Sequence, residues 1–369
     1  MKISSIQAAA IEIPLKRNFG GSTYDILKRS TIVTKLRTSD GLESIVYNGD
    51  NRTDGPEIVR IIEQELAPAI KGDSIFAYER TWAKMFKFSI PVRNRKLLLE
   101  AIACVDCAIW DAIGKANRRS IHELLGAHKN DVPLISIGGY YFDGRPHDDI
   151  ATEVHAYQSA GMAGCKFKVG GLSPEKDAER VKIARSAVTS DFVLAVDANR
   201  GWEASDAIRF ARLVEPLDIA WFEEPCHWYN DVAATARVRN ATSIPINCGQ
   251  SEITAHGVGR LIHGDAVDMI NVDASECGGV TEWRRAAAMC GTSNVTMTHH
   301  EESQIALHLM SAIPHGRYIE CFGDPDRDPI WHGMWTNRPP VKDGKMTVPK
   351  AAGFGIELDP DMIARFRIA

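Results

Sequence analysis

From residue 131 onward the chain repeats one pattern, a short apolar run followed by an amphipathic segment, roughly every 20–30 residues. Short apolar runs predict strands, and apolar residues at helical spacing predict helices. The apolar runs occupy residues 134–138, 165–169, 192–196, 220–222, 244–248, 269–272, 295–298 and 318–319. Helix-period segments between them include residues 174–188, 203–214, 281–290 and 304–313. Eight strand-then-helix units favour a parallel (β/α)8 barrel, a modified TIM barrel, over an open sheet.

The N-terminal part of the chain does not alternate in this way. Strands are predicted at 3–13, 30–38 and 41–46, with a hairpin turn at Ser39-Asp40-Gly41, and helices near 56–66, 77–85 and 95–115. Strands first and helices afterwards are typical of an α+β domain. The end of the chain also lacks the barrel period. We therefore expect an N-terminal α+β capping domain at 1–127, a barrel at 128–330 and a C-terminal segment at 331–369 that completes the capping domain.

Composition narrows the class of protein. The 369 residues are 44% hydrophobic and 25% charged, which is ordinary for a globular protein. The net charge of −5 argues against a nucleic-acid or anionic-membrane partner. No apolar run is long enough to span a bilayer, and the first residues lack a signal peptide's apolar core. We expect a soluble, cytoplasmic protein that binds neither nucleic acid nor membrane.

Eight cysteines are scattered along the chain. Only Cys104 and Cys107 form a C-x-x-C pair, and they lie inside a strongly apolar predicted helix. Buried free thiols are therefore expected rather than zinc ligands, redox chemistry or a disulfide framework.

Ionisable or amide side chains follow seven consecutive predicted strands, from the second to the eighth. In a parallel barrel the carboxyl ends of the strands meet at one face, which is where active sites lie in this architecture. The groups are Lys166-Phe167-Lys168, Asp197-Ala198-Asn199, Glu223-Glu224, Gln250-Ser251-Glu252, Asp273, His299-His300 and Glu320. This concentration of polar groups predicts an active site at that face.

The lysine pair suggests a base. Strand alternation places Lys166 and Lys168 on the same face. Two like charges so close lower each other's pKa, so we expect one of these lysines to be neutral and basic near neutral pH.

Two pairs of residues stand on neighbouring strands. Asp197 and Glu223 are inward carboxylates, a set that favours a hard divalent cation such as Mg²⁺, although a helix-capping role for Asp197 stays open. Asp273 lies one strand before His299 and His300. A carboxylate that accepts a hydrogen bond from imidazole fixes its tautomer and raises its basicity, as a general acid or base requires. Chemistry alone does not choose between the two histidines.

Taken together, these residues resemble the enolase superfamily, specifically the mandelate racemase-type branch of the mandelate racemase/muconate lactonizing enzyme family, over essentially the whole chain. The motifs that carry the resemblance are Lys166-Phe167-Lys168, Val196-Asp197-Ala198-Asn199, Phe222-Glu223-Glu224-Pro225, Asp273 with His300, and Glu320. The resemblance implies one Mg²⁺ ion per active site, held by Asp197 and Glu223. It also implies a homo-oligomer.

The resemblance further implies the roles of the catalytic residues. Lys168 is one base, with Lys166 beside it, and His300, paired with Asp273, is the other. Glu320 would hydrogen-bond the substrate carboxylate as negative charge develops on it.

One position departs from the family pattern. The third metal ligand is normally a glutamate directly after a glycine at the end of the fifth strand, where this chain has Gln250. A neutral amide oxygen can bind the ion but offers it less charge. Glu252, two residues on, is the alternative third ligand.

This site implies removal of the proton next to a carboxylate, for which Mg²⁺ and a base on each side of the carbon are the expected equipment. The substrate is therefore a small-molecule carboxylate. Dehydration of an acid sugar to a 2-keto-3-deoxy acid is favoured over racemisation, epimerisation or cycloisomerisation, because the segments expected to cover the site, 20–24 and 47–52, are polar. A non-catalytic family member is a further alternative. Candidate substrate contacts are Asn199, Tyr140, Tyr24, Asn51 and Arg93.

Overall fold

The computed structural model describes residues 1–91, 93–142 and 144–369. An antiparallel sheet opens the chain, formed by β1 (Ile3–Gly20), β2 (Asp25–Thr38) and β3 (Glu43–Asn48) in that order. Helical segments follow: α1 (Gly55–Ile61), η1 (Ile62–Leu66), α2 (Ala67–Ile70), η2 (Ile75–Ala77), α3 (Tyr78–Phe86), η3 (Lys87–Ser89), α4 (Arg95–Asn117) and α5 (Ile121–Leu124). The predicted α+β capping domain, with its hairpin turn between β2 and β3, is confirmed.

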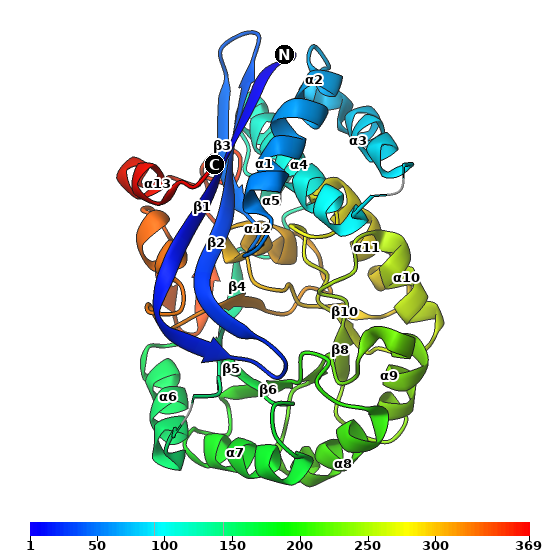
Figure 1. The fold of residues 1–369 in the computed structure, drawn as a ribbon, viewed down its shortest axis with the longest axis vertical. Helices are drawn as coiled ribbons and strands as arrows, with labels where there is room; N and C mark the ends of the chain where they lie inside the picture. Colours follow the sequence, from blue (N-terminus) through cyan, green and yellow to red (C-terminus); the bar gives the residue numbers. More distant parts are fainter. Residues whose placement is uncertain (92, 143) are drawn as a thin grey trace.

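The hairpin of β1 and β2 is longer than the sequence pattern indicated. Pairing shifts register after Pro14 and resumes at Phe19 opposite Ile26. The charged and amide residues 16–18 between these points are exposed, so this part of the strand lacks the apolar pattern by which a strand is predicted from sequence. This extension carries the tip of the hairpin down to the strands β5 and β6 of the second part of the chain (Figure 1).

The second part is a parallel sheet that alternates with helices. Its strands are β4 (Asp131–Gly138), β5 (Gly164–Lys168), β6 (Val193–Asp197), β7 (Phe222–Glu223), β8 (Ile246–Cys248), β9 (Met269–Ile270), β10 (Thr296–Met297) and β11 (Ile319–Cys321). Between them lie α6 (His147–Ser159), α7 (Pro174–Ser186), α8 (Ala204–Val214), η4 (Glu215–Leu217), η5 (Trp228–Asn230), α9 (Asp231–Arg239), α10 (Ala255–His263), α11 (Val280–Thr292) and α12 (Ser303–Ala312). Every predicted apolar run overlaps one of these strands.

Pairing runs without interruption from β11 through β4 to β10. At the remaining seam β10 and β11 share no ladder in the described residues, and the chain on the two sides meets at isolated bridges, Met297 with Gly316 and Glu302 with Glu320. The carboxyl ends of all these strands therefore face the same side, toward the β1–β2 hairpin (Figure 1).

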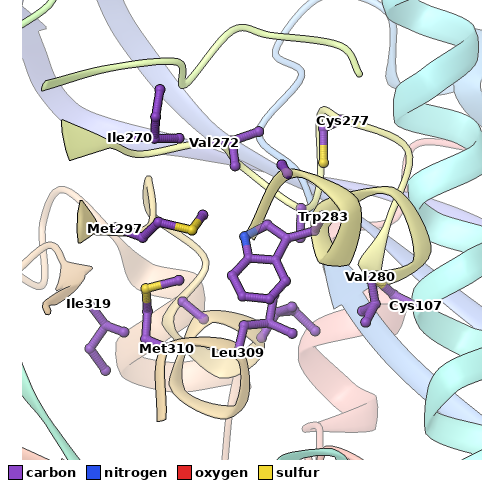
Figure 2. Packing of buried hydrophobic residues seen from close by; sticks show 14 of the residues in the cluster. Cys107, Ile270, Val272, Cys277, Val280, Trp283, Met297, Leu309, Met310 and Ile319 are labelled. Atoms are coloured by element: carbon purple, nitrogen blue, oxygen red, sulfur yellow. The ribbon is translucent and has the colours of Figure 1, made fainter. Parts of the chain in front are cut away.

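One hydrophobic core joins the two parts. Trp283 of α11 packs among Met297, Leu309 and Met310, close to the strand residues Ile270 and Ile319 (Figure 2). The same cluster includes Cys107 of the capping helix α4. Because apolar packing is continuous across the boundary, the capping helices and the barrel form one packed unit.

The end of the chain returns to its beginning. After η6 (Ile330–Met334), β12 (Val341–Lys342) and β13 (Lys345–Thr347), α13 (Pro360–Phe366) lies beside β1 (Figure 1). The backbone of Ala10 exchanges hydrogen bonds with Ile368 and Ala369, at 2.8 and 3.1 Å. These contacts agree with the expected return of the C-terminal segment, while the boundaries at 127/128 and 330/331 stay predictions.

The cysteines behave as expected. All eight are free and buried, including Cys104 and Cys107 within α4. In the described ranges, the structure contains no helix with both the length and the apolar character needed to cross a membrane.

Candidate active site

Three neighbouring strands align the central residues of the site. Lys168, Asp197 and Glu223 are direct partners across β5, β6 and β7, each at the carboxyl end of its strand. Lys168 Nζ donates to Asp197 Oδ2 at 2.8 Å and Lys166 Nζ donates to Glu223 Oε1 at 2.6 Å. Because the strands are parallel and in register, residues that are far apart in sequence share one buried face.

Lys166 lies among three carboxylates. Besides Glu223, its Nζ lies 2.7 Å from Glu320 Oε1 and 3.6 Å from Asp197 Oδ2, and all four side chains are fully buried. Glu223 is held from its other side, where Trp221 Nε1 and Asn247 Nδ2 donate to Oε2 at 3.1 and 3.2 Å. The predicted cluster of Lys166, Asp197, Glu223 and Glu320 is thus one ionic network.

The lysines do not have the low pKa that their spacing suggested. Burial lowers the pKa of Lys166, but the carboxylates of Glu223, Glu320 and Asp197 outweigh burial and hold it well above its usual value. Lys168 behaves likewise: burial lowers its pKa, Asp197 raises it, and the net shift is upward. Lys166 does lower the pKa of Lys168, as expected, but the effect is too small to decide the outcome. The expectation was wrong because it counted only the two like charges.

The predicted ligands of a divalent cation are the side-chain oxygens of Asp197, Glu223 and Gln250, and the surroundings of Gln250 show whether it suits this role. Gln250 follows Gly249, whose φ of +118° lets the chain turn at the end of β8. The Gln250 Oε1 atom is buried and has no hydrogen-bond partner in the described structure. A buried carbonyl oxygen without a partner is costly unless a ligand takes its lone pairs, and a hard cation does so readily. Asp197, Glu223 and Gln250 therefore fit such an ion.

Glu252 is not part of this set. Its carboxylate pairs with Arg260 Nη2 on α10 at 2.9 Å, since the chain turns away after Gly249. The alternative that Glu252 replaces Gln250 as a ligand is wrong for this structure. Across residues 1–91, 93–142 and 144–369, no group of three or more His, Cys, Asp or Glu side chains is arranged to hold a metal ion. A divalent cation bound by Asp197 and Glu223 would therefore need a neutral third ligand.

A histidine–aspartate pair lies on the opposite side of the barrel mouth. His300 Nδ1 is 3.0 Å from Asp273 Oδ2, and Asp273 Oδ1 accepts the backbone N–H of Ser275 at 2.7 Å. Burial lowers the pKa of His300, and the positive charges of Lys166 and Lys168 lower it further. The imidazole is therefore neutral and within electrostatic reach of both lysines.

The structure distinguishes the two histidines. His299 is fully buried, its Nε2 accepts the N–H of Ala274 at 3.1 Å, and its Nδ1 lies 2.8 Å from the carbonyl oxygen of His300. Both ring nitrogens of His299 are thus used by the backbone. Only His300 can carry a proton toward a substrate.

Two of the candidate substrate contacts lie beside Lys168. Tyr24, from the tip of the β1–β2 hairpin, donates its hydroxyl to Asn199 Oδ1 at 2.8 Å, and Lys168 Nζ donates to the same oxygen at 2.8 Å. Tyr140, after β4, is buried and accepts a hydrogen bond from Arg327 Nε at 3.3 Å. The hairpin tip therefore closes over the lysine side of the site.

Asn51 and Arg93 do not join the site. Asn51 Nδ2 donates to Glu100 Oε2 at 2.7 Å, and its Oδ1 accepts the N–H of Asp54, so its side chain is used by the turn after β3. It lines a cavity of about 320 Å³ together with Ser275 and Glu276, which follow Asp273 in the chain. Arg93 pairs with Glu65 at 2.8 Å within the capping domain. A hydrogen bond to Glu100 fixes the side chain of Asn51, and an ion pair with Glu65 fixes that of Arg93.

Sequence reasoning missed a ring of charges around His300. Glu301 Oε1 lies 3.6 Å from His300 Nε2, and the Glu301 N–H donates to Glu320 Oε2 at 3.0 Å. Arg29 of β2 is buried and contacts four carboxylates, those of Asp50, Glu302, Asp328 and Glu301, at 3.1, 3.3, 3.3 and 3.9 Å. Glu301 could have been found, because it directly follows His300. Nothing in the pattern of β2 marks Arg29.

Comparison with known proteins agrees with this architecture. The enolase C-terminal domain-like family model matches residues 149–362, and the mandelate racemase/muconate lactonizing enzyme N-terminal domain model matches residues 7–126. The chain is 26% identical to 3,6-anhydro-alpha-L-galactonate cycloisomerase of Streptomyces coelicolor, over 99% of both proteins. It is also 26% identical to L-talarate/galactarate dehydratase of Salmonella typhimurium, over 92% of this chain and 83% of that enzyme.

A solved structure shares the whole fold. The crystal structure of a mandelate racemase/muconate lactonizing enzyme from a marine actinobacterium, in complex with magnesium, superposes with a TM-score of 0.93 and 41% identity, covering 100% of this chain and 99% of that one. The chain therefore belongs to the mandelate racemase/muconate lactonizing enzyme family of the enolase superfamily.

Proposed function

We propose that this protein is an enzyme that removes the proton next to the carboxylate of an acid sugar and dehydrates the sugar to a 2-keto-3-deoxy acid. The observation that carries the proposal is the placement of Lys168 and the His300–Asp273 pair around two buried carboxylates, Asp197 and Glu223. A base on each side of one carbon is what this chemistry needs.

The metal expected here is Mg²⁺, with Asp197, Glu223 and Gln250 as the ligands. Bound there, Mg²⁺ supplies the positive charge that makes the proton next to a carboxylate acidic enough to be removed. The magnesium complex of the 41% identical structure supports this assignment.

The residues of the chain then divide the proton transfers. Lys168 takes the proton from the carbon in its neutral form, which the positive charge of a cation held by Asp197 would favour by offsetting that carboxylate and lowering the pKa of the amine. Asn199, whose Oδ1 lies 2.8 Å from Nζ, orients the amine. His300 acts as the acid in its protonated form: Nδ1–H stays on Asp273, Nε2 gives its proton to the departing hydroxyl group, which leaves as water, and the imidazole becomes neutral. Lys166 and Glu320 bind the substrate carboxylate as its negative charge grows, and burial raises the pKa of Glu320, which favours a protonated, hydrogen-donating form.

Dehydration is favoured over racemisation or epimerisation, in which a proton returns to the same carbon, because the site can bind the hydroxyl groups of an acid sugar. Tyr24, Tyr140 and Asn199 gather beside Lys168, where a hydroxylated substrate would lie. The relationship to a talarate/galactarate dehydratase points the same way.

Cycloisomerisation is the second candidate, because the relative from Streptomyces coelicolor is a cycloisomerase that matches 99% of the chain. It uses the same first step, as do racemisation and epimerisation, and differs in what His300 does afterwards.

The test is a screen of aldonic and aldaric acids with Mg²⁺ in deuterated water. Semicarbazide detects keto acids, and NMR detects exchange of the proton next to the carboxylate. Keto-acid formation that disappears in Lys168→Met supports dehydration. Exchange without keto acid supports racemisation or epimerisation. Keto acid formed only from lactones or anhydro acids, added to the same screen, supports cycloisomerisation. Neither reaction with any acid contradicts the proposed function.

The eight unpaired, buried cysteines support our expectation of a reducing compartment, the cytoplasm. A homo-oligomer stays a prediction.

A further inference from the structure

Arg327 is a buried arginine at the edge of the site. It follows β11, and its side chain lies in a small apolar cluster that includes Phe322 and Tyr140. Its guanidinium carbon is 3.9 Å from the centre of the Phe322 ring and 5.6 Å from that of Tyr140. With 1% of the residue exposed, its charge is almost fully removed from water.

This charge has no ion partner. Among the described residues Arg327 forms no salt bridge, its Nε donates to the Tyr140 hydroxyl, and its Nη1 is buried without any hydrogen-bond partner. Arg29, equally buried nearby, contacts four carboxylates. A buried guanidinium is normally paired and fully hydrogen-bonded, because desolvating an unpaired charge is costly. Among the described residues, Arg327 therefore has no carboxylate at ion-pair distance. Burial lowers its pKa, but the more distant charges of Asp50 and Glu301 help to raise it.

Arg327 lies next to the residues proposed for catalysis. Burial raises the pKa of Tyr140 to about 12, while the positive charges of Arg327 and Lys168 both act against this rise, so the phenol lies within reach of both. The charge of Arg327 also lowers the pKa of Glu301, whose carboxylate lies beside His300 Nε2. A substrate held between Lys168 and His300 is thus close to Arg327.

The reacting carboxylate is not the missing anion. It is assigned to the fully buried network of Lys166, Glu320 and the two strand-end carboxylates, and among the described residues none of these side chains forms an ion pair with Arg327. The planar fork of an arginine matches a carboxylate, and a hydroxyl group would leave the charge uncompensated.

Resting on the proposed function, we infer that Arg327 is a specificity-determining residue that binds a second carboxylate of the substrate, so that the substrate is a diacid sugar rather than a monoacid sugar. Tyr140 holds the guanidinium through Nε and leaves the Nη1 edge for this carboxylate.

The test compares aldaric acids with the aldonic acids of the same configuration, which differ only in a terminal carboxylate in place of a hydroxymethyl group. We expect kcat/KM with Mg²⁺ to be at least about tenfold higher for the diacid. In Arg327→Met this preference disappears through loss of the diacid reaction. In Arg327→Lys, which keeps the charge without the fork, part of the preference remains. Binding to Lys168→Met, measured by calorimetry, should show the same order without turnover.

Arg284 is a matched control. Its guanidinium also lies against two aromatic rings, Tyr78 and Trp110, and its Nη1 donates to the Tyr78 hydroxyl at 3.2 Å, far from the barrel mouth. Arg284→Met should keep the diacid preference. Should Arg327→Met fail to fold, Arg327→Lys and Tyr140→Phe carry the test.

The outcomes separate the two proposals. Keto-acid formation with equal use of diacids and monoacids, or a preference unchanged in Arg327→Met and Arg327→Lys, overturns the inference and leaves the dehydratase proposal standing. A preference for phosphorylated monoacids also overturns it. Absence of reaction with every acid sugar contradicts the proposed function itself, while calorimetry still reports whether Arg327 selects diacids.

Discussion

His300 Nδ1 lies 3.0 Å from Asp273 Oδ2, and this contact joins the carboxyl ends of two neighbouring parallel strands. Asp273 is itself fixed by the N–H of Ser275. The imidazole therefore presents Nε2 to the site in a single tautomer.

Replacing Asp273 by Asn is expected to lower kcat by about 10²–10⁴-fold, because the amide no longer stabilises a protonated imidazole and can hold the wrong tautomer. KM should change much less, since Asp273 does not contact the substrate. Steady-state kinetics measure both constants. A kcat near that of the parent enzyme would show that His300 is not the acid that drives the reaction.

A variant of Glu301 gives a second test of the role of His300, because Glu301 Oε1 is 3.6 Å from His300 Nε2. Glu301→Gln removes a negative charge beside the proton-carrying nitrogen, so the pKa of His300 should fall. The acidic form then persists only to lower pH, and the pH optimum of kcat should shift downward with it. An unshifted pH–rate profile contradicts a role for Glu301 in holding the proton on His300.

Gln250 is expected to limit metal affinity. Gln250→Glu adds a third charged oxygen ligand, and we expect it to tighten Mg²⁺ binding by about tenfold or more. Glu252→Gln is the matched control, since Glu252 pairs with Arg260 and should leave Mg²⁺ affinity unchanged. Titration calorimetry measures the affinity without substrate. If Gln250 is a ligand, Gln250→Glu must bind Mg²⁺ more tightly than the parent protein does. Equal Mg²⁺ affinities of the parent protein, Gln250→Glu and Glu252→Gln would exclude Gln250 as a ligand.

The regular features of this chain were predictable from sequence, and the irregular ones were not. Apolar runs located the barrel strands, and the residues after them led to Lys168, Asp197 and Glu223, because parallel strands bring their ends together. Arg29 and Arg327 were missed, since a buried charge breaks the hydrophobic pattern and its partners come from distant segments.

The side chains of Asn51 and Arg93 show the opposite error. Asn51 was predicted from its place in a polar segment expected to cover the site, and Arg93 was a further candidate substrate contact. Glu100 and Glu65 instead bind their side chains within the capping domain. Sequence indicates which loops approach a site, but not which way each side chain turns, because hydrogen-bond and ion-pair partners from other segments decide the direction. The prediction of a low pKa for the lysine pair was wrong for the same reason. The sequence shows the two lysines side by side, but it does not show the carboxylates that surround them in the fold.

The burial of His308 leads to a prediction of how the free energy of unfolding depends on pH. It lies buried in α12, its Nδ1 accepts the N–H of His122 at 3.3 Å, and its Nε2 donates to the carbonyl of Phe354 at 2.9 Å. A proton on Nδ1 would break the first of these bonds. Burial accordingly lowers the pKa of His308 from 6.5 to about 4.

Between pH 6.5 and pH 4 the unfolded chain therefore binds a proton at this residue that the folded chain does not, and stability falls as the pH falls. The loss from this residue amounts to about 3 kcal/mol at the lower end. A glutamine can donate to Phe354 and accept from His122 without titrating, so His308→Gln should flatten the slope of unfolding free energy against pH in this window. His299, whose pKa burial also lowers to about 4, keeps part of the slope. Urea unfolding at a series of pH values measures the change, and parallel curves for variant and parent would show that His308 is already protonated in the folded protein.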